Sequence, residues 1–424
     1  MDTILNFQFK IDEISIVFCV LGVIVFLMAG IFSFEYMKHE GHHLRYTIFY
    51  LLAFGVYVAL CFAGNLITYY LFFELLTLTT FPLVLHNESK EAVMAGLKYL
   101  FYSLCGAYMS LFGLYFVYKY GETLSFTKGG VFSDVVFNDN SGLLLICTML
   151  MIFGFGVKGG MLPMHAWLPT AHPVAPAPAS AVLSAVIVKA GVLGIIRTVY
   201  YIFGANRIKG TWVQSTWIVF TLITVFMGSM LAYREDVLKK RLAYSTVSQV
   251  SYILFGLAVM TEDSYTGGLM HVLAHGFIKC GLFLVSGAII YTTGKTKVSE
   301  LKGIGKIMPF TIWCFTILSL GLIGIPPTGG FISKWYLATG ALFSNIPVFS
   351  WLGPVILLLS ALLTAGYLLP ISINGLLPGE DFDDESVKKN EPNLIMVLPI
   401  LVLTILTVIL GVFPQILDIL RGMQ

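Results

Sequence analysis

The chain has 424 residues, of which 57% are hydrophobic and only 11% are charged, and its mean hydropathy is +0.86. This composition excludes a soluble globular protein or a nucleic-acid-binding protein and indicates a polytopic membrane protein. The formal net charge of +2 excludes little, because in a membrane protein the placement of charge among the loops matters more than its sum.

Twelve apolar segments are long enough to cross a membrane, since about 20 helical residues span its hydrocarbon core. The first of them is not preceded by a basic region, so we expect no cleaved signal peptide. The predicted fold is therefore all-α, with about twelve transmembrane helices. The expected spans are residues 14–34, 46–62, 65–85, 94–118, 142–172, 179–203, 212–232, 242–260, 267–291, 309–341, 352–376 and 394–413.

Two of these spans contain residues that interrupt helices. The span 142–172 includes Gly159, Gly160 and Pro163, and the span 309–341 includes the sequence GIPPTGG. Because proline removes a backbone donor and clashes with the preceding turn, we expect both helices to be broken near their middle. Non-helical backbone at membrane depth is tolerated only beside protein or a water-filled cavity, so the breaks predict a hydrated interior.

The broken helix is the fourth in each of two consecutive sets of five. Since five is odd, the second set must run through the membrane in the opposite direction, which is the pattern of an inverted-repeat transporter. We therefore expect an N-terminal helix in residues 1–45, a first five-helix repeat in 46–210, an inverted second repeat in 211–376, and a loop with a C-terminal helix in 377–424.

Lysine and arginine are distributed unequally between the two ends of the predicted bundle, with fourteen at one end and six at the other. The positive-inside rule assigns the richer end to the cytoplasm, and this assignment puts both termini outside. The hydrophilic loop from Gly379 to Asn390 is then expected to be a solvated cytoplasmic connection.

The cysteines lie singly within apolar segments, without a CxxC pair. This distribution favours buried small side chains over iron–sulfur clusters, zinc sites or disulfides. The chain also lacks a Rossmann glycine motif and a flavin signature, so we expect no metal and no cofactor in it. The cysteines are Cys19, Cys61, Cys105, Cys147, Cys280 and Cys314.

Several ionisable residues remain within the predicted spans. Such groups are functional candidates, because an unpaired charge in hydrocarbon costs several kcal/mol. Glu74 is the acid nearest the middle of a helix, and we expect it to lie close enough to Lys158 to interact directly or through one water. The alternatives are static ties between helices or, for Arg197 near its helix end, a side chain that reaches the interface. The basic residues are Lys158, Lys189, Arg197, Lys279 and Lys334.

The sequence HVLAHGFIKCG places His271, His275 and Lys279 four residues apart, on one stripe of a helix. Two histidines with this spacing can bind a metal, but HExxH is absent and no acid or third histidine is near. A water-linked proton path is therefore favoured over a metal site and over polar packing. His165 and His172 flank the first break, where they either line its cavity or cap free backbone groups.

Five motifs together resemble one known family. They resemble the antiporter-like subunits shared by respiratory complex I, membrane-bound hydrogenases and Mrp-type sodium/proton antiporters, and the likeness covers nearly the whole chain. In chain order the motifs are FELLTLTTFPLVL, GFGVKGGMLPMHAWLPTAHPVAPAPASAVLSAVIVKAGVLGIIR, LKKRLAYSTVSQVSYILFGLA, HVLAHGFIKCGLFLVSG and GIPPTGGFISKWYL.

The resemblance implies roles for individual residues in a proton relay. Glu74 would face Lys158 at the first break, Lys189 would pass the proton along, and Lys334 on the second broken helix would complete the path. His271, His275 and Lys279 match the polar links between the half-channels, and Lys240 matches a basic residue at the cytoplasmic end of its helix. We expect the row to lie at one depth near the membrane midplane, with Lys334 the most accessible to solvent.

Compared with the family pattern, two further N-terminal helices and a long lateral C-terminal helix are expected but not found. Both differences concern partners rather than the channel. The segment FISKW, which contains Lys334, is more similar to membrane-bound hydrogenases and their relatives than to mitochondrial complex I.

These features favour an ion-translocating subunit of a redox-driven complex in a prokaryotic cell membrane. Its partners would be other membrane subunits, including further antiporter-like ones, peripheral redox subunits and lipid. The alternatives are a subunit of an Mrp-type secondary antiporter, a scaffold whose charges are structural ties, and an enzyme with a quinone or metal site. The missing ligand motifs disfavour the last of these.

Overall fold

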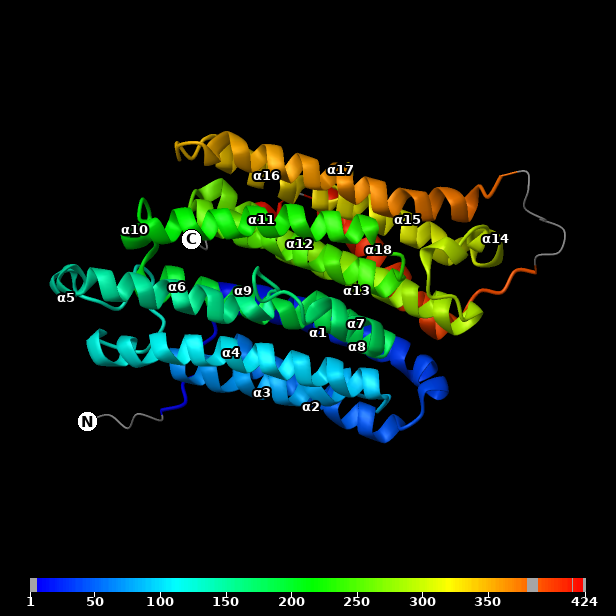
Figure 1. Ribbon diagram of the computed structural model, residues 1–424, viewed down its shortest axis with the longest axis horizontal. Helices are drawn as coiled ribbons and strands as arrows, with labels where there is room; N and C mark the ends of the chain where they lie inside the picture. Colours follow the sequence, from blue (N-terminus) through cyan, green and yellow to red (C-terminus); the bar gives the residue numbers. More distant parts are fainter. Residues whose placement is uncertain (1–5, 380–387, 414, 422–424) are drawn as a thin grey trace.

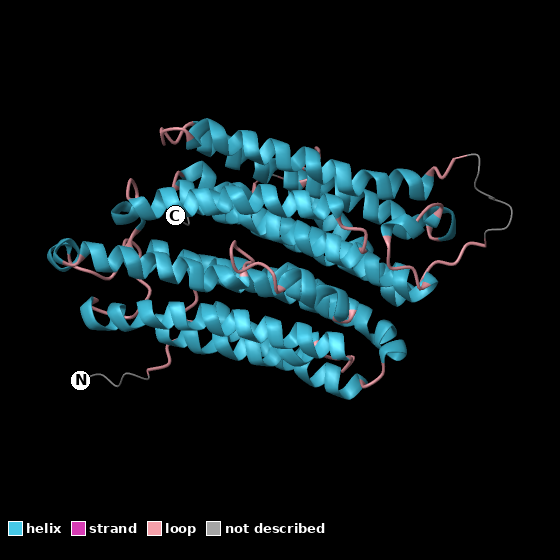
Figure 2. Cartoon of the chain, in the orientation of Figure 1, coloured by secondary structure: helices cyan, strands magenta, loops and turns pink. Residues whose placement is uncertain are grey.

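The computed structural model describes residues 6–379, 388–413 and 415–421, which form a bundle of long, roughly aligned helices (Figures 1 and 2). β-Sheet pairing in these residues is limited to three isolated bridges, and no strand forms. The prediction of an all-α polytopic fold is confirmed.

The helices begin where side chains can cap them. The side chains of Asn65, Ser89 and Thr261 accept backbone N–H groups in the first turns of the helices that follow them, which satisfies donors that a helix leaves free. The helices are α1 (Glu13–Glu40), α2 (His43–Cys61), α3 (Leu66–Val84), α4 (Lys90–Tyr120), α5 (Asp134–Asp139), α6 (Ser141–Lys158), α7 (Leu168–Val174), α8 (Ala177–Val182), η1 (Leu183–Ile187), α9 (Val188–Ile196), η2 (Arg197–Phe203), α10 (Ala205–Ile208), α11 (Trp212–Arg234), α12 (Leu238–Val259), α13 (Glu262–Thr293), η3 (Val298–Glu300), α14 (Ile304–Ile307), α15 (Pro309–Ile323), α16 (Gly329–Leu342), α17 (Phe349–Leu376), α18 (Leu394–Val412) and α19 (Ile416–Arg421).

The described residues contain 11 helices that are long and apolar enough to cross a membrane. The remaining predicted span, 309–341, is divided between α15 and α16, which have 15 and 14 residues. The continuous segment Ala177–Phe203 counts as one span of 27 residues. All twelve expected spans are therefore found as helices, and two of them, 142–172 and 309–341, are divided into two pieces.

Both breaks occur where the sequence predicts them. Helix α6 ends at Lys158 and α15 ends at Ile323. Gly160 has φ +73° and Gly324 has φ +93°, values in the left-handed region that glycine adopts without steric cost. The chain resumes a helix at α7 after the first break and at α16 after the second.

The direction of the helices agrees with an inverted arrangement of the two five-helix sets. Helix α1 begins, and α18 ends, at the same end of the bundle (Figure 1). Helix α2, the first of one set, starts at the opposite end of the bundle from α11, the first of the other. The superposition of the two sets as repeats and the predicted domain boundaries stay predictions.

Three segments form the centre of the bundle. The most apolar windows of residues 177–203, α12 and α13 are 100%, 94% and 94% buried, whereas those of the other spans are between 33% and 61% buried. Residues 177–203 do not form a regular α-helix, because the π-helical segments η1 and η2 lie on either side of α9. Polar side chains on these central segments are therefore enclosed by protein rather than by lipid.

The predicted hydrophilic loop from Gly379 to Asn390 lies mostly outside the described residues. Of this loop, the structure describes only Gly379 and residues 388–390.

Candidate functional site

Lys158, the last residue of α6, reaches helix α3. Its side chain is 2% exposed, and its Nζ donates to Thr77 Oγ1 at 2.6 Å and to the Phe73 carbonyl at 3.3 Å. The ammonium group also lies 4.4 Å from the centre of the Phe73 ring, a distance at which the ring's negative face attracts a cation. The lysine thus binds to the same turn of α3 that carries Glu74.

Glu74 lies between these two partners in the sequence but does not bind Lys158 itself. In the described part of the chain, no hydrogen bond or ion pair joins the two side chains, and Glu74 Oε1 is buried without a hydrogen-bond partner. Their charges are near enough to interact. The direct contact expected from the sequence is therefore absent, and a bridge through one water stays a prediction.

Lys189 and His275 are in direct contact at the centre of the bundle. Both side chains are 0% exposed. Lys189 Nζ lies 2.6 Å from His275 Nδ1 and donates to the Ser184 carbonyl at 3.0 Å. An amine and an imidazole joined by a hydrogen bond can exchange a proton without moving.

His271 extends this contact along α13 toward the second broken helix. The rings of His271 and His275 are stacked with centroids 5.9 Å apart. His271 Nδ1 lies 2.8 Å from Ser333 Oγ, and its Nε2 lies 3.1 Å from Gln249 Oε1. The amide nitrogen of Gln249 has no partner in the described residues. A turn of this amide would present a donor instead of an acceptor, so His271 can keep its hydrogen bond in either protonation state.

Lys334 lies on α16, directly after Ser333, and reaches back across the second break. Its Nζ donates to the carbonyls of Leu322 and Ile323 at 2.6 and 3.0 Å. These carbonyls belong to the end of α15, where helical carbonyls lack internal partners and attract a cation. Lys334 is partly exposed at the surface of the bundle, whereas Lys158 and Lys189 are buried. The expectation that Lys334 has the readiest access to solvent stays a prediction.

An aromatic ring connects Lys334 with the histidines. Lys334 Nζ lies 4.9 Å from the centre of the Tyr252 ring, and the same ring is stacked on His271 with centroids 5.6 Å apart. The side chains of Lys189, His275, His271 and Lys334 therefore form one connected series across α9, α13 and α16. We call these four residues the central row.

Lys279 continues the stripe of α13 beyond the central row. It is four residues beyond His275, as His275 is four residues beyond His271, and each step is about 6 Å at 1.5 Å per residue. Its Nζ donates to the Leu242 carbonyl, in the first turns of α12, at 2.9 Å. The expectation that all these residues lie at a similar depth in the membrane stays a prediction.

The two secondary candidates lie outside this series. Lys240 forms an ion pair with Glu235 at 2.7 Å and is 37% exposed. His165 is partly buried within the first break, where its Nδ1 has no partner among the described residues. The neighbouring Lys239 precedes the expected span 242–260, but it lies within α12, is 6% exposed and donates to the Ala175 carbonyl at 2.7 Å.

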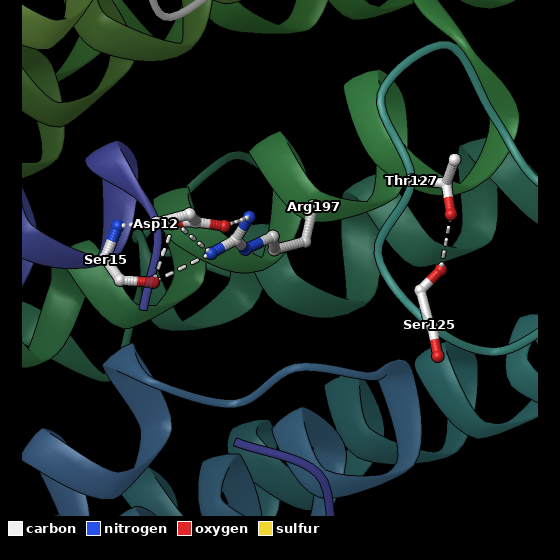
Figure 3. Close-up of polar contacts among 5 residues, drawn as sticks. All are labelled: Asp12, Ser15, Ser125, Thr127 and Arg197. Atoms are coloured by element: carbon white, nitrogen blue, oxygen red, sulfur yellow. Dashed lines mark hydrogen bonds and ion pairs between the residues drawn. The ribbon is translucent and has the colours of Figure 1, made fainter. Parts of the chain in front are cut away.

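Arg197 is buried rather than directed toward the interface, so this sequence-based expectation is wrong. It is 1% exposed and donates to the Asp12 carboxylate at 2.6 and 2.9 Å and to Ser15 Oγ at 3.0 Å (Figure 3). The rings of Phe126 and Tyr201 cover its guanidinium at 4.9 and 4.7 Å. Asp12 also caps α1 by accepting the Ser15 N–H, but nothing in the sequence near either residue indicates their pairing.

The ion pair determines the protonation of Asp12, which lies just before the first span. Partial burial opposes ionisation of this carboxyl group, but the hydrogen bonds and charge of Arg197 outweigh it. Together with the hydrogen bonds from Ser15, they hold the pKa of Asp12 below its usual value.

The described residues contain no cluster of three or more histidine, cysteine, aspartate or glutamate side chains that could bind a metal ion. The absence of a metal or cofactor from the working protein stays a prediction.

Two family models match the chain. The model described as "NADH:quinone oxidoreductase/Mrp antiporter, TM" matches residues 63–373. The model described as "NADH-Ubiquinone oxidoreductase (complex I), chain 5 N-terminus" matches residues 2–47. The first match contains every residue of the central row.

Curated relatives come from several kinds of complex. NADH-quinone oxidoreductase subunit N of Desulforudis audaxviator is 32% identical over 381 residues, 87% of this chain and 74% of the relative. F(420)H(2) dehydrogenase subunit N of Methanosarcina mazei is 30% identical, over 85% of this chain and 73% of the relative. One subunit of the Na(+)/H(+) antiporter of Alkalihalophilus pseudofirmus is 27% identical, over 94% of this chain and 79% of the relative.

Two solved structures share the fold. A chain of the Mrp complex from Dietzia sp. DQ12-45-1b matches with a TM-score of 0.86 and 23% identity, over 99% of this chain and 84% of that chain. A chain of the membrane-bound sulfane sulfur reductase, an archaeal respiratory membrane complex, matches with a TM-score of 0.87 and 23% identity, over 99% and 83%.

Proposed function

The chain belongs to the NADH:quinone oxidoreductase/Mrp antiporter family, and from this premise we propose that it is an ion-translocating subunit of a redox-driven membrane complex. Protons, alone or together with sodium ions, pass through this chain, while electrons pass through partner subunits. The complex resembles complex I or a membrane-bound hydrogenase and lies in a prokaryotic cell membrane. The lysine-rich end of the bundle faces the cytoplasm, and both termini lie outside.

The observation that carries this proposal is the contact between Lys189 and His275. Two positive charges 2.6 Å apart would repel each other by about 6 kcal/mol at an effective dielectric constant of 20. The pair therefore holds one proton rather than two, and that proton can lie on either partner. A purely structural tie would pair opposite charges instead, as Arg197 and Asp12 do.

The remaining contacts give the shared proton a route. His271 and Tyr252 connect the pair to Lys334, and Lys158 lies at the other break, beside α3. We infer that Glu74, Lys158, the central row and Lys279 are the proton-relay residues. Lys240 and His165, which lie at the edge of this set, are secondary candidates.

The energies involved are compatible with electrostatic coupling between neighbouring sites. Moving one charge against 100 mV requires about 2.3 kcal/mol. A unit charge that appears about 8 Å from a lysine changes the energy of its ammonium form by about 2 kcal/mol at an effective dielectric constant of 20. The effect of a change of charge in an adjacent subunit near the Glu74–Lys158 site is therefore of the same order as the energy that translocation requires.

A subunit of a secondary Na(+)/H(+) antiporter is the second candidate. The Na(+)/H(+) antiporter relative from Alkalihalophilus pseudofirmus, which aligns with 94% of this chain, favours it. The two candidates differ in their partners: the first requires peripheral redox subunits, and the second requires none.

Purification of the tagged chain from its native membrane tests the choice. We expect further antiporter-like membrane subunits to co-purify with peripheral redox subunits, and the complex in proteoliposomes to acidify or alkalinise the lumen when its electron donor is added. A complex without redox subunits that exchanges Na⁺ for H⁺ would establish the second candidate. A complex that assembles normally and pumps at the wild-type rate with Lys189→Ala would establish a scaffold role.

A further inference from the structure

His172, on α7 just beyond the first break, is a buried histidine outside the relay. Its side chain is 0% exposed and its ring is stacked on Phe283 of α13, with centroids 4.7 Å apart and planes 25° from parallel. Neither ring nitrogen has a hydrogen-bond partner among the described residues. Buried polar groups in folded proteins almost always have partners, so two free nitrogens on one ring require an explanation.

Two buried lysines lie near this ring, on two other helices. Lys239, in the first turn of α12, is 6% exposed, and Lys279, on α13, is 0% exposed. Lys279 is four residues before Phe283 on α13, so it lies one turn from the ring on which His172 is stacked. Lys239 binds the turn that directly follows α7. Each lysine has one protein acceptor assigned to it, the Ala175 carbonyl for Lys239 and the Leu242 carbonyl for Lys279, so each ammonium group keeps further protons for other partners.

The backbone around His172 is fixed, so the position of its ring is defined. Ser180 Oγ donates to the His172 carbonyl at 3.0 Å and to the Ala175 carbonyl at 3.4 Å. The Ala175 carbonyl is also the acceptor for Lys239. The turn between α7 and α8 therefore holds His172 and Lys239 in one local network.

The two lysines also differ in their distance from water. Lys239 begins α12 next to Lys240, whose ion pair with Glu235 is at the surface. Lys279 is fully buried and lies one turn along α13 from His275, whose ring contacts Lys189 of the central row. A spatial series therefore leads from one end of the bundle to its centre, in the order Lys239, His172, Lys279, Lys189.

We propose that His172 is the proton-transfer residue of a hydrated branch that joins the central row to the end of the bundle at which α12 begins. This inference rests on the proposed function, because the branch carries ions only if the central row does. The ligands of the two free nitrogens are water molecules, one toward Lys239 and one toward Lys279.

Each transfer along the branch conserves protons and charge. The Lys239 ammonium gives a proton through water to the unprotonated nitrogen of His172, and the other ring nitrogen releases its proton toward the neutral amine of Lys279. Lys239 regains a proton from the aqueous end. Lys279 then passes its proton toward Lys189, and His172 returns to a neutral ring.

Structural packing and metal binding are the other roles for this histidine. Packing against Phe283 needs a flat ring but no nitrogen, so phenylalanine would serve equally well. A metal site needs more ligands than one imidazole, and the described residues contain no suitable group. Only the transfer role makes use of both nitrogens.

The test compares His172→Phe and His172→Gln with wild type in the intact complex, reconstituted in proteoliposomes. His172→Phe keeps the stacked ring, and His172→Gln keeps polar groups that do not titrate. We expect both complexes to assemble and the rate of ion translocation to fall on the order of 10²-fold, the scale on which positioned acid–base groups act. In His172→Ala, added imidazole should restore a measurable part of this rate.

Two control variants separate the possible results. Phe283→Leu removes the stacking partner but leaves the imidazole, and Lys189→Ala interrupts the central row. Wild-type translocation by assembled His172→Phe and His172→Gln, together with loss in Lys189→Ala, overturns the branch and leaves the proposed function intact. If His172→Phe, His172→Gln and Lys189→Ala all translocate ions at the wild-type rate, the proposed function itself is overturned. If Phe283→Leu loses as much activity as His172→Phe and imidazole restores nothing in His172→Ala, the role of His172 is packing.

Discussion

Lys189 and His275 are 86 positions apart in the chain, and their side-chain nitrogens lie 2.6 Å from each other. They come from α9 and α13, which belong to the most buried part of the bundle. Lipid cannot supply a hydrogen-bond partner to either group, so each provides the other's. If the two basic groups share one proton, as proposed above, a change in the charge near one of them changes the proton occupancy of both.

Replacing either member of this pair should therefore remove translocation. We expect Lys189→Gln and His275→Gln each to reduce proton pumping on the order of 10²-fold in proteoliposomes. The double variant should be no worse than either single variant, since one shared proton is lost in all three. Additive losses would mean that the two residues act separately.

Glu74→Gln and Lys158→Ala should each abolish most ion pumping while the complex still assembles. Lys158 already has neutral partners in Thr77 and Phe73, so the loss of the Glu74 charge leaves its hydrogen bonds in place. Assembly is checked by the subunit composition of the purified complex. Thr77→Val is the matched control, because it removes a hydrogen bond to Lys158 but no charge. Normal pumping by the assembled Lys158→Ala complex would contradict the role of this lysine.

At position 334 the ability to titrate should matter more than the ability to donate hydrogen bonds. Lys334 donates to the carbonyls of Leu322 and Ile323. Lys334→Glu keeps a titratable group, Lys334→Gln keeps a donor, and Lys334→Ala keeps neither. We expect pumping rates to decrease in the order wild type, Glu, then Gln and Ala together. If Lys334→Gln pumps as fast as wild type, the role of Lys334 is only to donate hydrogen bonds to the end of α15.

The ion pair of Asp12 and Arg197 predicts an asymmetric effect on stability. Arg197 is 1% exposed and Asp12 is 22% exposed, so water can reach the acid but not the base. Asp12→Asn leaves a buried cation alone and should cost about 3–5 kcal/mol, although asparagine preserves the helix cap. Arg197→Met should cost less, because the carboxylate left behind can be hydrated. Thermal unfolding of the detergent-solubilised complex measures both, and equal losses would mean that packing around Arg197 dominates.

The same pair predicts how stability depends on pH. The pKa of Asp12 is lowered in the folded protein, so its contribution is complete above the unfolded value of about 3.9. This contribution is lost as the pH falls through the lower, folded pKa. The difference in unfolding temperature between wild type and Asp12→Asn should be constant at neutral pH and shrink in strong acid. A difference that is unchanged at pH 2 would show that Asp12 is not ionised in the pair.

The sequence was sufficient to predict the elements and most members of the site. Hydrophobic length marks the spans, and glycine and proline at the breaks identify the two helices that are divided. The sequence also identifies Lys189 as an ionisable residue within an apolar span, although not its contact with His275. These predictions depend on rules that act within one helix or one environment.

The errors concern relationships in three dimensions. Arg197 pairs with Asp12, 185 positions away, and nothing local indicates that distance. Which of Lys239 and Lys240 faces inward depends on the rotation of the first turn of α12, which an apolar pattern does not define. The spacing of His271, His275 and Lys279 shows that they share one stripe of a helix, but it does not show which side chains of other helices they contact.

The π-helical segments on either side of α9 give Lys189 a property that an ordinary helix would not have. Each π turn holds one residue more than an α turn can accommodate, and such turns are frequent at functional sites. If the extra residue passes from one side of Lys189 to the other, the helix keeps its length and both of its ends. Its lysine, however, turns by about 100° around the axis, the angle of one α-helical residue. Movement of the extra residue would therefore rotate the Lys189 side chain between two defined directions without changing the length of the helix.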